Sequence, residues 1–557
     1  MYDLVKGMPS THGDHYQLNT TTLLRQGART YPEQEIAYRD ERGTWTRYTY
    51  ADCLKRVAQI AGMLDELGTK PGDVVGVLDW NGIRHWELYW GIPAIGAVML
   101  QMNLRLAPED LAYVTRHAGA RFVCVDETLL PVAEKLAPHT PDVEKWIVMS
   151  DKPLSEISTT LENVVHFEDL VGAQPTSYDW PMIEETSAYS ACYTTGTTGA
   201  PKGVYYSHRG IYLHATGLAL NISMNREDAV MLITPMFHSS GWGLPQAAVL
   251  TAAKIVLPGR YSAEDIGMLV DGMIAENVTV ANGAPAIFQP MMNYIKTLDD
   301  KPDLSRARLL CGATEPPISM MRDFYEYTGA DVIHAYGATE TTPMVACNAG
   351  VKPSLVDTLS VEEKWDLKRC QGLPLTGVDI RIVDAENNDL PHDGQAQGEV
   401  LLRGPWIIES YHNLEESPEE AAARFHEGYW RSGDVGKIEP NGYLKLTDRI
   451  KDVVKSGGEW ISSIDMENAI LSHPKVRDAA VVGIEHPKWQ ERPVAIVVTD
   501  PADPVTLAEI NQLLEGQFAK WQLPDTLEIV DVLPRTSVGK LDKKVMRVQY
   551  ADLYKDA

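Results

Sequence analysis

Short β-branched runs alternate with helix-like segments along most of this chain, and no other feature constrains its fold as strongly. Residues 50–68 have the apolar spacing of an amphipathic helix, and residues 73–78 after them read as a buried strand. The pattern returns at 108–118, where Pro108 suits a first helical position, and at 121–125. Such alternation predicts parallel sheets flanked by helices, which is an α/β fold.

The pattern changes twice toward the C-terminus. From about Val378 the segments become short strands and turns, which predicts a β-rich subdomain. Beyond residues 449–451 about a hundred residues have the pattern of a small α+β domain. We therefore predict a large N-terminal domain (1–449) of parallel and mixed sheets, and a small C-terminal domain (450–557). The C-terminal domain should contain helices at 463–471 and 507–518, and strands at 476–484, 493–499 and 526–530.

Length and composition set outer limits on the protein class. The 557 residues would allow three or four folding units at roughly 150 residues each. The formal net charge of -27 argues against a nucleic-acid or anionic-membrane partner, because both need a basic surface. Six cysteines without C-x-x-C spacing argue against a disulfide framework or a zinc site. Cys192 and Cys311, close to proposed site motifs, are predicted to be small buried side chains rather than nucleophiles.

No targeting or membrane segment is expected. The first residues lack a basic region followed by an apolar core, so no signal peptide is predicted. The most apolar run, residues 88–100, is interrupted by Gly91, Pro93 and Gly96 and is too short to cross a bilayer. A cytoplasmic enzyme fits these observations.

Residues 193–204 have the sequence Tyr-Thr-Thr-Gly-Thr-Thr-Gly-Ala-Pro-Lys-Gly-Val, which is typical of a phosphate-binding loop. Glycines let the backbone approach a ligand closely, and their N–H groups can form a concave anion site. Hydroxyls add donors, and one lysine adds a positive charge. A surface linker is the alternative, and the spacing is not that of a P-loop. The predicted phosphate-binding residues are Thr194, Thr195, Gly196, Thr197, Thr198, Gly199 and Lys202.

Together with later motifs, this loop resembles that of the adenylate-forming enzymes, the superfamily of acyl-CoA synthetases, luciferases and peptide-synthetase adenylation domains. The chain is most similar to bacterial fatty-acyl-CoA synthetases, and the resemblance covers essentially its whole length. The other matching motifs, in order, are residues 236–238, 336–341, 398–399, 403–405, 430–434, 448–452, 455–460 and 534–540.

The resemblance implies a two-step reaction. A carboxylic acid first attacks the α-phosphorus of ATP and releases pyrophosphate, and coenzyme A then takes the acyl group from the adenylate and releases AMP. Glu340 should bind Mg²⁺ with help from Thr194, because a hard cation prefers carboxylate oxygen. A solvated turn carboxylate is the alternative for Glu340.

The resemblance also assigns the nucleotide site. Tyr336 and Gly337 should flank the adenine, although Tyr336 alone could be a core residue. Thr339 should donate to the α-phosphate, and Asp434 should accept from both ribose hydroxyls. The remaining nucleotide-binding residues are expected to be Arg449, Gly312, Ala313, His334, Ala335, Lys455 and Trp460.

Lys540 resembles the family's catalytic lysine, which bridges the carboxylate and the α-phosphate. Composition alone would not select it, since such a lysine is ordinarily solvated. For the second step the resemblance implies that the C-terminal domain is mobile and rotates about Lys451. This rotation would bring in Gly457 and Gly458, which leave room for pantetheine. An ordinary Gly-Gly turn is the alternative there.

The acyl site is less well defined by sequence. His238 resembles the histidine or aromatic residue that lines it, and Trp242 resembles the tryptophan that gates the acyl tunnel in bacterial fatty-acyl-CoA synthetases. A structural histidine and a core tryptophan are the alternatives. Ser239 and Ser240 are more polar than an alkyl tunnel requires, which also allows a shorter or heteroatom-bearing acid. Further walls are expected from Asn282, Gly283, Ala284 and Met344.

The sequence therefore predicts an ATP-dependent acid–CoA ligase for a medium- or long-chain fatty acid, with ATP, Mg²⁺ and coenzyme A as its small molecules. One alternative is a ligase for a short, branched or substituted acid, such as a hydroxy, thioether or aryl acid. Others are an adenylating enzyme with a non-CoA acceptor and a non-catalytic relative. The absence of a carboxylate at residues 236–240 argues against amino-acid activation. The nearest family also suggests a homodimer.

Overall fold

The structure is a computed structural model that describes residues 5–13, 15–194, 200–262, 264–414, 417–457, 459–535 and 541–555. The chain divides into two compact units. The first unit comprises Met1–Asp379 and Arg403–Trp430, and the second comprises Ile380–Leu402 and Arg431–Ala557.

A seven-stranded sheet in the first unit confirms the predicted parallel α/β pattern. Its strands run in the order β7-β6-β5-β3-β4-β8-β9, and every neighbouring pair is parallel except β8 and β9. The bounds are β3 Val74–Leu78, β4 Val98–Gln101, β5 Ala120–Asp126, β6 Lys145–Met149, β7 Val164–His166, β8 Ala188–Tyr193 and β9 Gly203–Ser207.

A nine-stranded sheet forms the rest of the first unit's framework, in the order β16-β15-β14-β13-β12-β10-β11-β1-β2. Its six strands from β14 to β1 are parallel neighbours, and antiparallel strands close both edges. The bounds are β1 Glu35–Arg39, β2 Trp45–Thr49, β10 Ala229–Met231, β11 Lys254–Leu257, β12 Val280–Gly283, β13 Arg308–Cys311, β14 Asp331–Gly337, β15 Met344–Cys347 and β16 Leu373–Pro374.

One hydrophobic core is shared by these two sheets. Val75 of β3 and Phe122 of β5 belong to the same buried cluster as Val230 of β10 and Ile255 of β11 in the other sheet. This shared core explains why the chain forms two units and not the three or four that its length allows.

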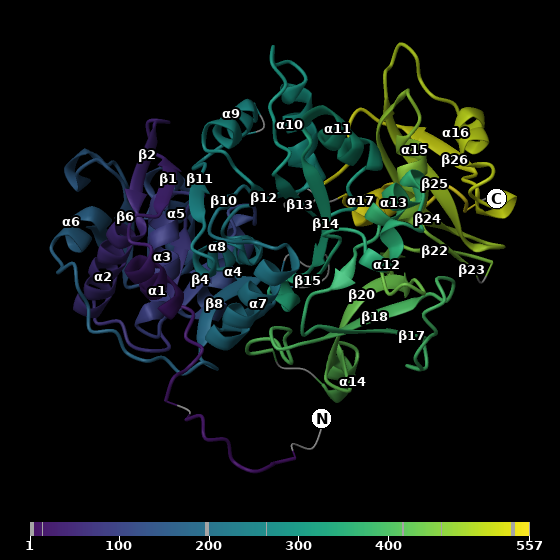
Figure 1. The fold of residues 1–557 in the computed structure, drawn as a ribbon. Helices are drawn as coiled ribbons and strands as arrows, with labels where there is room; N and C mark the ends of the chain where they lie inside the picture. The colour runs from purple at the N-terminus through teal and green to yellow at the C-terminus, as the bar shows by residue number, and fades with distance from the viewer. Residues whose placement is uncertain are drawn as a thin grey trace. The chain divides into compact units, whose positions relative to one another are not determined.

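Helices α9, α10 and α11 lie on one side of strands β10 to β14, and α7 and α8 lie on the other (Figure 1). The helices of the first unit are α1 Thr22–Thr30, α2 Tyr50–Glu66, α3 Ile83–Ala94, α4 Pro108–Ala118, α5 Leu130–Leu136, α6 Phe167–Gly172, α7 His208–Asn221, α8 Leu244–Leu250, α9 Gly267–Ala275, α10 Pro285–Ile295, α11 Ile318–Thr328, α12 Pro353–Val356, α13 Val361–Lys368 and α14 Pro418–Ala422.

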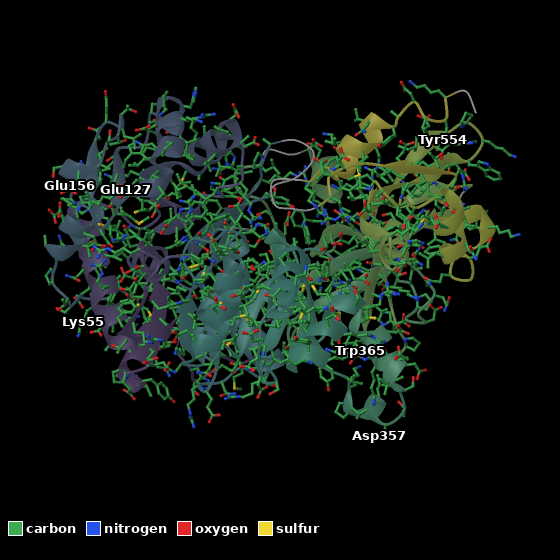
Figure 2. The ribbon with its side chains drawn as sticks, turned by 90° about the horizontal axis from the view of Figure 1, so that it is seen from above. Lys55, Glu127, Glu156, Asp357, Trp365 and Tyr554 are labelled. Atoms are coloured by element: carbon green, nitrogen blue, oxygen red, sulfur yellow. The ribbon has the colours of Figure 1, made fainter. Side chains whose placement is uncertain are left out.

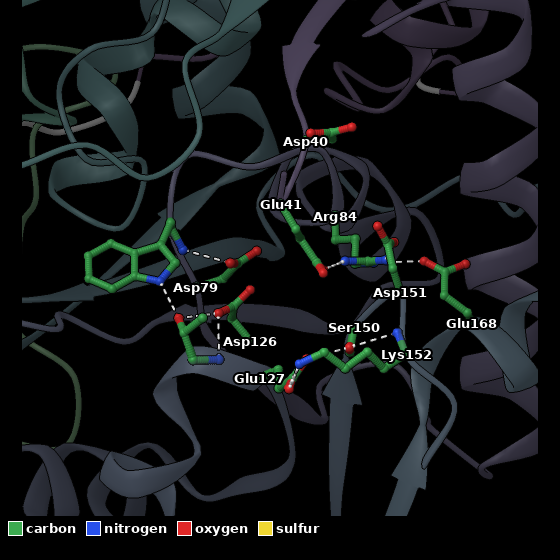
Figure 3. A network of polar contacts seen from close by, with 12 residues as sticks. Asp40, Glu41, Asp79, Arg84, Asp126, Glu127, Ser150, Asp151, Lys152 and Glu168 are labelled. Atoms are coloured by element: carbon green, nitrogen blue, oxygen red, sulfur yellow. Dashed lines mark hydrogen bonds and ion pairs between the residues drawn. The ribbon is translucent and has the colours of Figure 1, made fainter. Parts of the chain in front are cut away.

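Arg84 at the start of α3 ties several elements of the first unit together (Figure 3). Its guanidinium lies 2.6 Å from Glu41, 2.5 Å from Asp151 and 2.7 Å from Glu168. Glu41 belongs to the β1–β2 hairpin of the nine-stranded sheet, whereas Asp151 follows β6 of the seven-stranded sheet. Arg84 is mostly buried and its carboxylate partners are partly exposed, so this network ties one sheet to the other near the surface.

The C-terminal part is a smaller α+β assembly, as predicted. One five-stranded sheet has the order β17-β18-β20-β19 with β21 paired to β20, and another has the order β23-β22-β25-β24 with β26 paired to β25. Helix α16 ends at Leu514 and not at 518 as predicted, because Glu515 leaves the helical region and Gly516 adopts a φ of +97°. The bounds are β17 Asp379–Val383, β18 Gly398–Arg403, β19 Phe425–His426, β20 Tyr429–Ile438, β21 Leu444–Arg449, β22 Val454–Ser456, β23 Glu459–Ile461, β24 Val476–His486, β25 Gln490–Thr499, β26 Thr526–Ile529, α15 Ser463–Leu471, α16 Leu507–Leu514 and α17 Lys543–Gln549.

Aromatic side chains pack at the edges of both units. Trp365 of α13 makes an edge contact with Tyr325 of α11, and in the second unit Tyr554 lies against His486 (Figure 2). All six cysteines are buried free thiols, which confirms the burial predicted for Cys192 and Cys311. Within the residues that the structure describes, no helix has the length and apolarity to cross a membrane.

Candidate functional site

The ends of the Gly/Thr loop are held together at its base. The Thr194 N–H donates to the Lys202 carbonyl at 2.9 Å, and the Lys202 N–H donates to the Thr194 hydroxyl at 3.1 Å. These contacts extend the β8–β9 pairing by one step, so the loop leaves and re-enters the sheet at one point. The five predicted phosphate-binding residues from Thr195 to Gly199 lie outside the described residues.

Lys202, Glu340, Tyr411 and Arg424 gather around the Tyr411 ring, and we call them the Tyr411 cluster. The Lys202 Nζ lies 5.4 Å and the Arg424 Cζ 5.9 Å from the ring centroid. The Tyr411 hydroxyl donates to Glu340 Oε1 at 2.8 Å and accepts from Trp430 Nε1 at 3.2 Å. The cluster therefore places two cations and a carboxylate at the base of the loop.

Burial and charge perturb this cluster. Partial burial lowers the pKa of Lys202, and the Arg424 charge lowers it further, whereas Glu340 acts in the opposite direction. Burial and the nearby Glu340 carboxylate raise the pKa of Tyr411, so its hydroxyl stays protonated as a donor. The charges of Lys202 and Glu340 therefore interact in the folded chain, although these residues are far apart in the sequence.

Strand β14 leads into the turn that carries Glu340. The backbone allows only glycine at Gly337, because a Cβ there would lie 2.0 Å from the Pro343 carbonyl oxygen. The Thr339 carbonyl accepts from the Tyr206 hydroxyl at 2.7 Å, and its own hydroxyl lies 3.2 Å from that of Ser239. Two of the predicted nucleotide residues, Gly337 and Thr339, therefore have defined positions in the turn that carries Glu340.

Residues 232–243, which we call the clamped segment, follow β10 without regular secondary structure for most of their length. The Asn81 side-chain amide donates to three successive carbonyls, those of Leu232, Ile233 and Thr234, at 2.7, 3.2 and 2.9 Å. The Asn81 Oδ1 accepts from the Met236 N–H at 2.8 Å. Buried backbone groups need partners, and here one side chain supplies four of them.

Other side chains complete the support of the clamped segment. Asn282 accepts from the Thr234 N–H at 3.2 Å and donates to the Gly241 carbonyl at 3.1 Å. The Tyr89 hydroxyl donates to the Met236 carbonyl, and the Tyr261 hydroxyl donates to that of Ile233 at 2.8 Å. Asn282 is fully buried, so its amide serves the segment's backbone.

The clamped segment ends in an unusual left-handed run. Five consecutive residues, Ser239 to Gly243, have φ between +38° and +73°, and three of them are not glycine. Such backbone is costly and persists only where the surroundings enforce it. The run starts directly after His238 and places the Trp242 ring against Gly312, where a Cβ would lie 3.1 Å from the ring. Trp242 is buried, with 7% of its surface exposed.

The hydroxyls of the serines in this run contact protein groups. Ser239 pairs with Thr339, and the Ser240 hydroxyl lies 3.5 Å from that of Ser190 and 3.6 Å from the Cys192 sulfur. The sequence-based expectation of a polar acid relied on these hydroxyls facing substrate. Because these hydroxyls contact protein groups, they give little support to the expectation of a polar acid.

Several other predicted site residues have defined partners. The His334 ring lies 2.9 Å from the Arg369 carbonyl, and burial lowers the pKa of His334 to about 4. The Met344 N–H donates to His214 Nε2 at 3.2 Å. Ala313 takes a φ of +71°, Ala284 caps α10, and Gly283 lies against Phe288. The imidazole of His334 and the amide of Asn282 thus have protein partners, while their assigned ligand roles stay predictions.

The second unit brings another predicted pair together. Asp434 of β20 and Arg449 of β21 are register partners, and Arg449 Nε lies 3.2 Å from Asp434 Oδ1. Asp434 is buried, with 6% of its surface exposed, and the Asp434 N–H donates to the Ser432 hydroxyl at 3.0 Å. The pair is consistent with two residues that serve one polar ligand.

The predicted hinge lies in a charged environment within the second unit. Burial lowers the pKa of Lys451, and the Arg449 charge contributes in the same direction. On one side Asp448 accepts from both the Ser463 N–H and hydroxyl at 2.6 Å, and on the other Asp452 pairs with Arg547. The carboxylates that flank Lys451 are thus both anchored.

The predicted pantetheine turn follows at β22 and β23. Lys455 and Trp460 are cross-strand partners, and 43% of the Trp460 surface is exposed. Gly457 takes a φ of +62°, and its N–H donates to the Trp489 carbonyl at 2.8 Å. Gly458 and Lys540 lie outside the described residues.

Sequence reasoning missed Tyr411, Arg424 and Asn81. Tyr411 and Arg424 approach Glu340 and Lys202 only through the fold, and no spacing along the chain indicates this. Asn81 follows strand β3, where a polar residue at the carboxyl end of a parallel strand could have drawn attention. No group of three or more His, Cys, Asp or Glu side chains in the described part of the chain could hold a metal.

Comparison with known proteins adds independent findings. Residues 24–412 match the model of the AMP-binding enzymes, and residues 465–540 match that of the AMP-binding enzyme C-terminal domain. A long-chain-fatty-acid–CoA ligase of Thermus thermophilus is 40% identical over 554 residues, which are 99% of this chain and 98% of the relative.

A second relative is a 3-methylmercaptopropionyl-CoA ligase of Ruegeria lacuscaerulensis. It is 36% identical over 535 residues, which cover 96% of this chain and 97% of the relative. Among solved structures, an anthranilate CoA ligase in complex with anthranoyl-AMP superposes with a TM-score of 0.81 at 24% identity, over 97% and 98% of the two chains. This last likeness concerns the fold.

Proposed function

The chain belongs to the AMP-binding enzyme family, and we propose that it is an ATP-dependent acid–CoA ligase that works through an acyl-adenylate. The match confirms the resemblance to adenylate-forming enzymes and to acyl-CoA synthetases. The Tyr411 cluster is the main support for the proposal, because it brings together a loop lysine and a carboxylate. The lysine can neutralise the phosphates of a nucleoside triphosphate, and the carboxylate can bind the Mg²⁺ that accompanies them.

In the first half-reaction, Lys202 would stabilise the negative charge of the triphosphate. Glu340 would hold Mg²⁺, which supplies charge neutralisation at the phosphates when bound. The donor set fits this ion, because Glu340 is a hard carboxylate whose Oε1 is fixed by the Tyr411 hydroxyl at 2.8 Å. Thr194 is the proposed additional ligand, since its hydroxyl lies at the base of the same loop.

The nucleoside would be bound by polar and aromatic groups. We assign Tyr336 and Gly337 to the adenine, Thr339 to the α-phosphate, and Asp434 with Arg449 to the ribose hydroxyls. The observed Asp434–Arg449 pairing supports the last assignment, because an oriented carboxylate accepts two hydroxyl donors well. These roles follow the family resemblance.

Lys540 and Lys451 are assigned to catalysis and to hinge motion. Lys540 would bridge the carboxylate and the α-phosphate in adenylation. Replacing Lys540 with alanine should slow adenylate formation by roughly 100-fold or more, whereas thioester formation from preformed adenylate should survive. Equal losses in both half-reactions would contradict this assignment.

The proposed acid is a medium- or long-chain fatty acid. The protein-bonded hydroxyls of Ser239 and Ser240 favour a plain alkyl chain over a heteroatom-bearing one. A short thioether acid is the second candidate, because one relative is named for 3-methylmercaptopropionyl-CoA. His238, Trp242, Gly283, Ala284 and Met344 are the proposed acyl-site residues.

The test is an acid panel that contains short, branched, medium-chain, long-chain, thioether and aryl acids. AMP, pyrophosphate and thioester are measured with and without coenzyme A. Equal amounts of AMP and thioester, with the fastest turnover on a fatty acid, are expected. Formation of ADP, or of adenylate that never transfers to coenzyme A, would refute the ligase.

Two further proposals rest on the sequence and on the family resemblance, respectively. We propose a cytoplasmic location and a homodimer. Light scattering behind size exclusion tests the second, and a mass near that of a single 61.8 kDa chain would contradict it.

A further inference from the structure

Arg424 is a charged residue of the Tyr411 cluster to which no role has been assigned so far. It follows helix α14 and is half-buried, and its guanidinium carbon lies 5.9 Å from the Tyr411 ring centroid. The same ring has the Lys202 ammonium 5.4 Å from its centroid and the Glu340 carboxylate on its hydroxyl. Two cations therefore converge on one aromatic residue at the base of the Gly/Thr loop.

Like charges brought together in a partly desolvated place repel one another. Lys202 and Arg424 form such a pair, because their charged groups lie 5.4 Å and 5.9 Å from the same ring centroid. A bound polyanion would reverse the cost, because each cation would then face negative charge. The arrangement is therefore better suited to a site with an anion than to one without.

The guanidinium differs from the ammonium in what it can recognise. Its planar fork donates two parallel hydrogen bonds to phosphate oxygens, whereas lysine provides a compact point charge. Glu340, the proposed Mg²⁺ ligand, shares the cluster, and such an ion binds the terminal phosphates of a nucleotide. In the proposed complex, Arg424 would therefore lie beside the phosphates that leave.

We propose that Arg424 is a second phosphate-binding cation, which contacts the β- and γ-phosphates of ATP and the pyrophosphate formed from them. This inference rests on the proposed acid–CoA ligase function. It predicts discrimination between nucleotides, because ATP carries the terminal phosphates and AMP lacks them.

A packing role for Arg424 makes a different prediction. If the guanidinium only covers the Tyr411 ring, its removal should perturb ATP and AMP binding alike. The chain offers a matched control in Arg322, whose guanidinium carbon lies 5.0 Å from the Trp365 ring centroid and which pairs with Glu362 on the surface. Arg322 shares the stacked geometry but lies outside the Tyr411 cluster.

The experiment measures ATP and AMP binding by calorimetry, in Mg²⁺, for the wild type and for Arg424→Gln, Arg424→Lys and Arg322→Ala. Arg424→Gln should bind ATP about 10-fold more weakly and AMP unchanged. Arg424→Lys should recover part of the loss, and Arg322→Ala should change neither affinity. Melting temperatures of all variants establish that each is folded.

Equal weakening for ATP and AMP, or no weakening for ATP, would overturn the inference. Should Arg424→Gln not fold, the ATP-to-AMP affinity ratio of Arg424→Lys decides in the same way, since a packing role predicts no change in that ratio. Failure of the proposed function is recognised separately, because the wild type would then form no acyl-adenylate with any acid of the panel.

Discussion

The Tyr411 cluster and the clamped segment hold their residues in place by opposite means. The cluster uses charged groups that are partly exposed and that repel or attract one another around one ring. The clamped segment uses neutral amides and hydroxyls, which are buried and bonded to backbone. We infer that the first arrangement serves the phosphates of ATP, and that the second holds the acid side.

Removal of the Glu340 charge should have the largest effect. Glu340→Gln keeps the acceptor for Tyr411 but loses the formal charge that Mg²⁺ requires. Adenylation should fall by roughly 100- to 1,000-fold, as measured by acid-dependent pyrophosphate exchange across a Mg²⁺ titration. Glu362→Gln, on the surface beside Arg322, should behave like the wild type. Unchanged exchange at all Mg²⁺ concentrations would remove Glu340 from the site.

A substitution of Asn81 tests the role of the clamped segment. Asn81→Ala leaves the Met236 N–H and the Leu232 and Thr234 carbonyls without their side-chain partner, at about 1–3 kcal/mol for each buried group left unsatisfied. The Ile233 carbonyl keeps its bond from the Tyr261 hydroxyl. The segment that carries His238 should shift, which should raise the KM for the acid roughly 10- to 100-fold with little change in the KM for ATP.

Asn293→Ala is the control for Asn81, since Asn293 accepts an exposed bond from Gln289. It should leave both KM values unchanged. Asn81→Asp should not restore the acid KM, because it keeps the acceptor for Met236 but places carboxylate oxygen against the three carbonyls. Equal rises in both KM values for Asn81→Ala would indicate a general structural role.

The difference between the two regions also explains what could be predicted. Lys202 and Glu340 lie inside motifs whose residue types already indicate phosphate and metal chemistry. Strands β3 and β5 were predictable because parallel strands are continuously apolar. Asn81 contacts groups 151 to 155 positions further along the chain, and Tyr411 contacts Glu340, 71 positions earlier, so no local pattern encodes these contacts.

Tyr411→Phe should have a smaller effect than either of the preceding variants. It removes the hydroxyl that orients Glu340 but keeps the ring between Lys202 and Arg424. Loss of one such bond is worth about 1 kcal/mol, so we expect a roughly fivefold higher Mg²⁺ requirement for exchange. The KM for the acid should not change. A rise in this KM would contradict the assignment of the Tyr411 cluster to ATP alone.

Asp79 provides the smallest test, because it is a buried carboxyl close to Asn81. Burial raises the pKa of Asp79 well above its usual range, and nearby Asp126 adds to the effect. Its acid form is favoured in the folded state, so Asp79 costs stability once the pH exceeds the ordinary carboxyl pKa. Asp79→Asn keeps an acceptor for the Trp80 N–H and cannot ionise.

Asp79→Asn should therefore melt at a higher temperature than the wild type at pH 7.5, by roughly a few degrees. The difference should shrink as the pH falls toward about 4, where the unfolded carboxyl also takes up its proton. Thermal melts across this range measure it, with exposed Asp300→Asn as control. A difference that does not depend on pH would refute the electrostatic explanation.

The most direct measurement compares Tyr411→Phe with Asn81→Ala in acid-dependent pyrophosphate exchange without coenzyme A, while Mg·ATP and the acid are varied separately. We predict a crossed result, in which Tyr411→Phe changes only the Mg·ATP dependence and Asn81→Ala changes mainly the acid dependence. If both variants shifted the Mg·ATP dependence and the acid dependence by the same factor, the Tyr411 cluster and the clamped segment would not serve different substrates. The account would then be wrong.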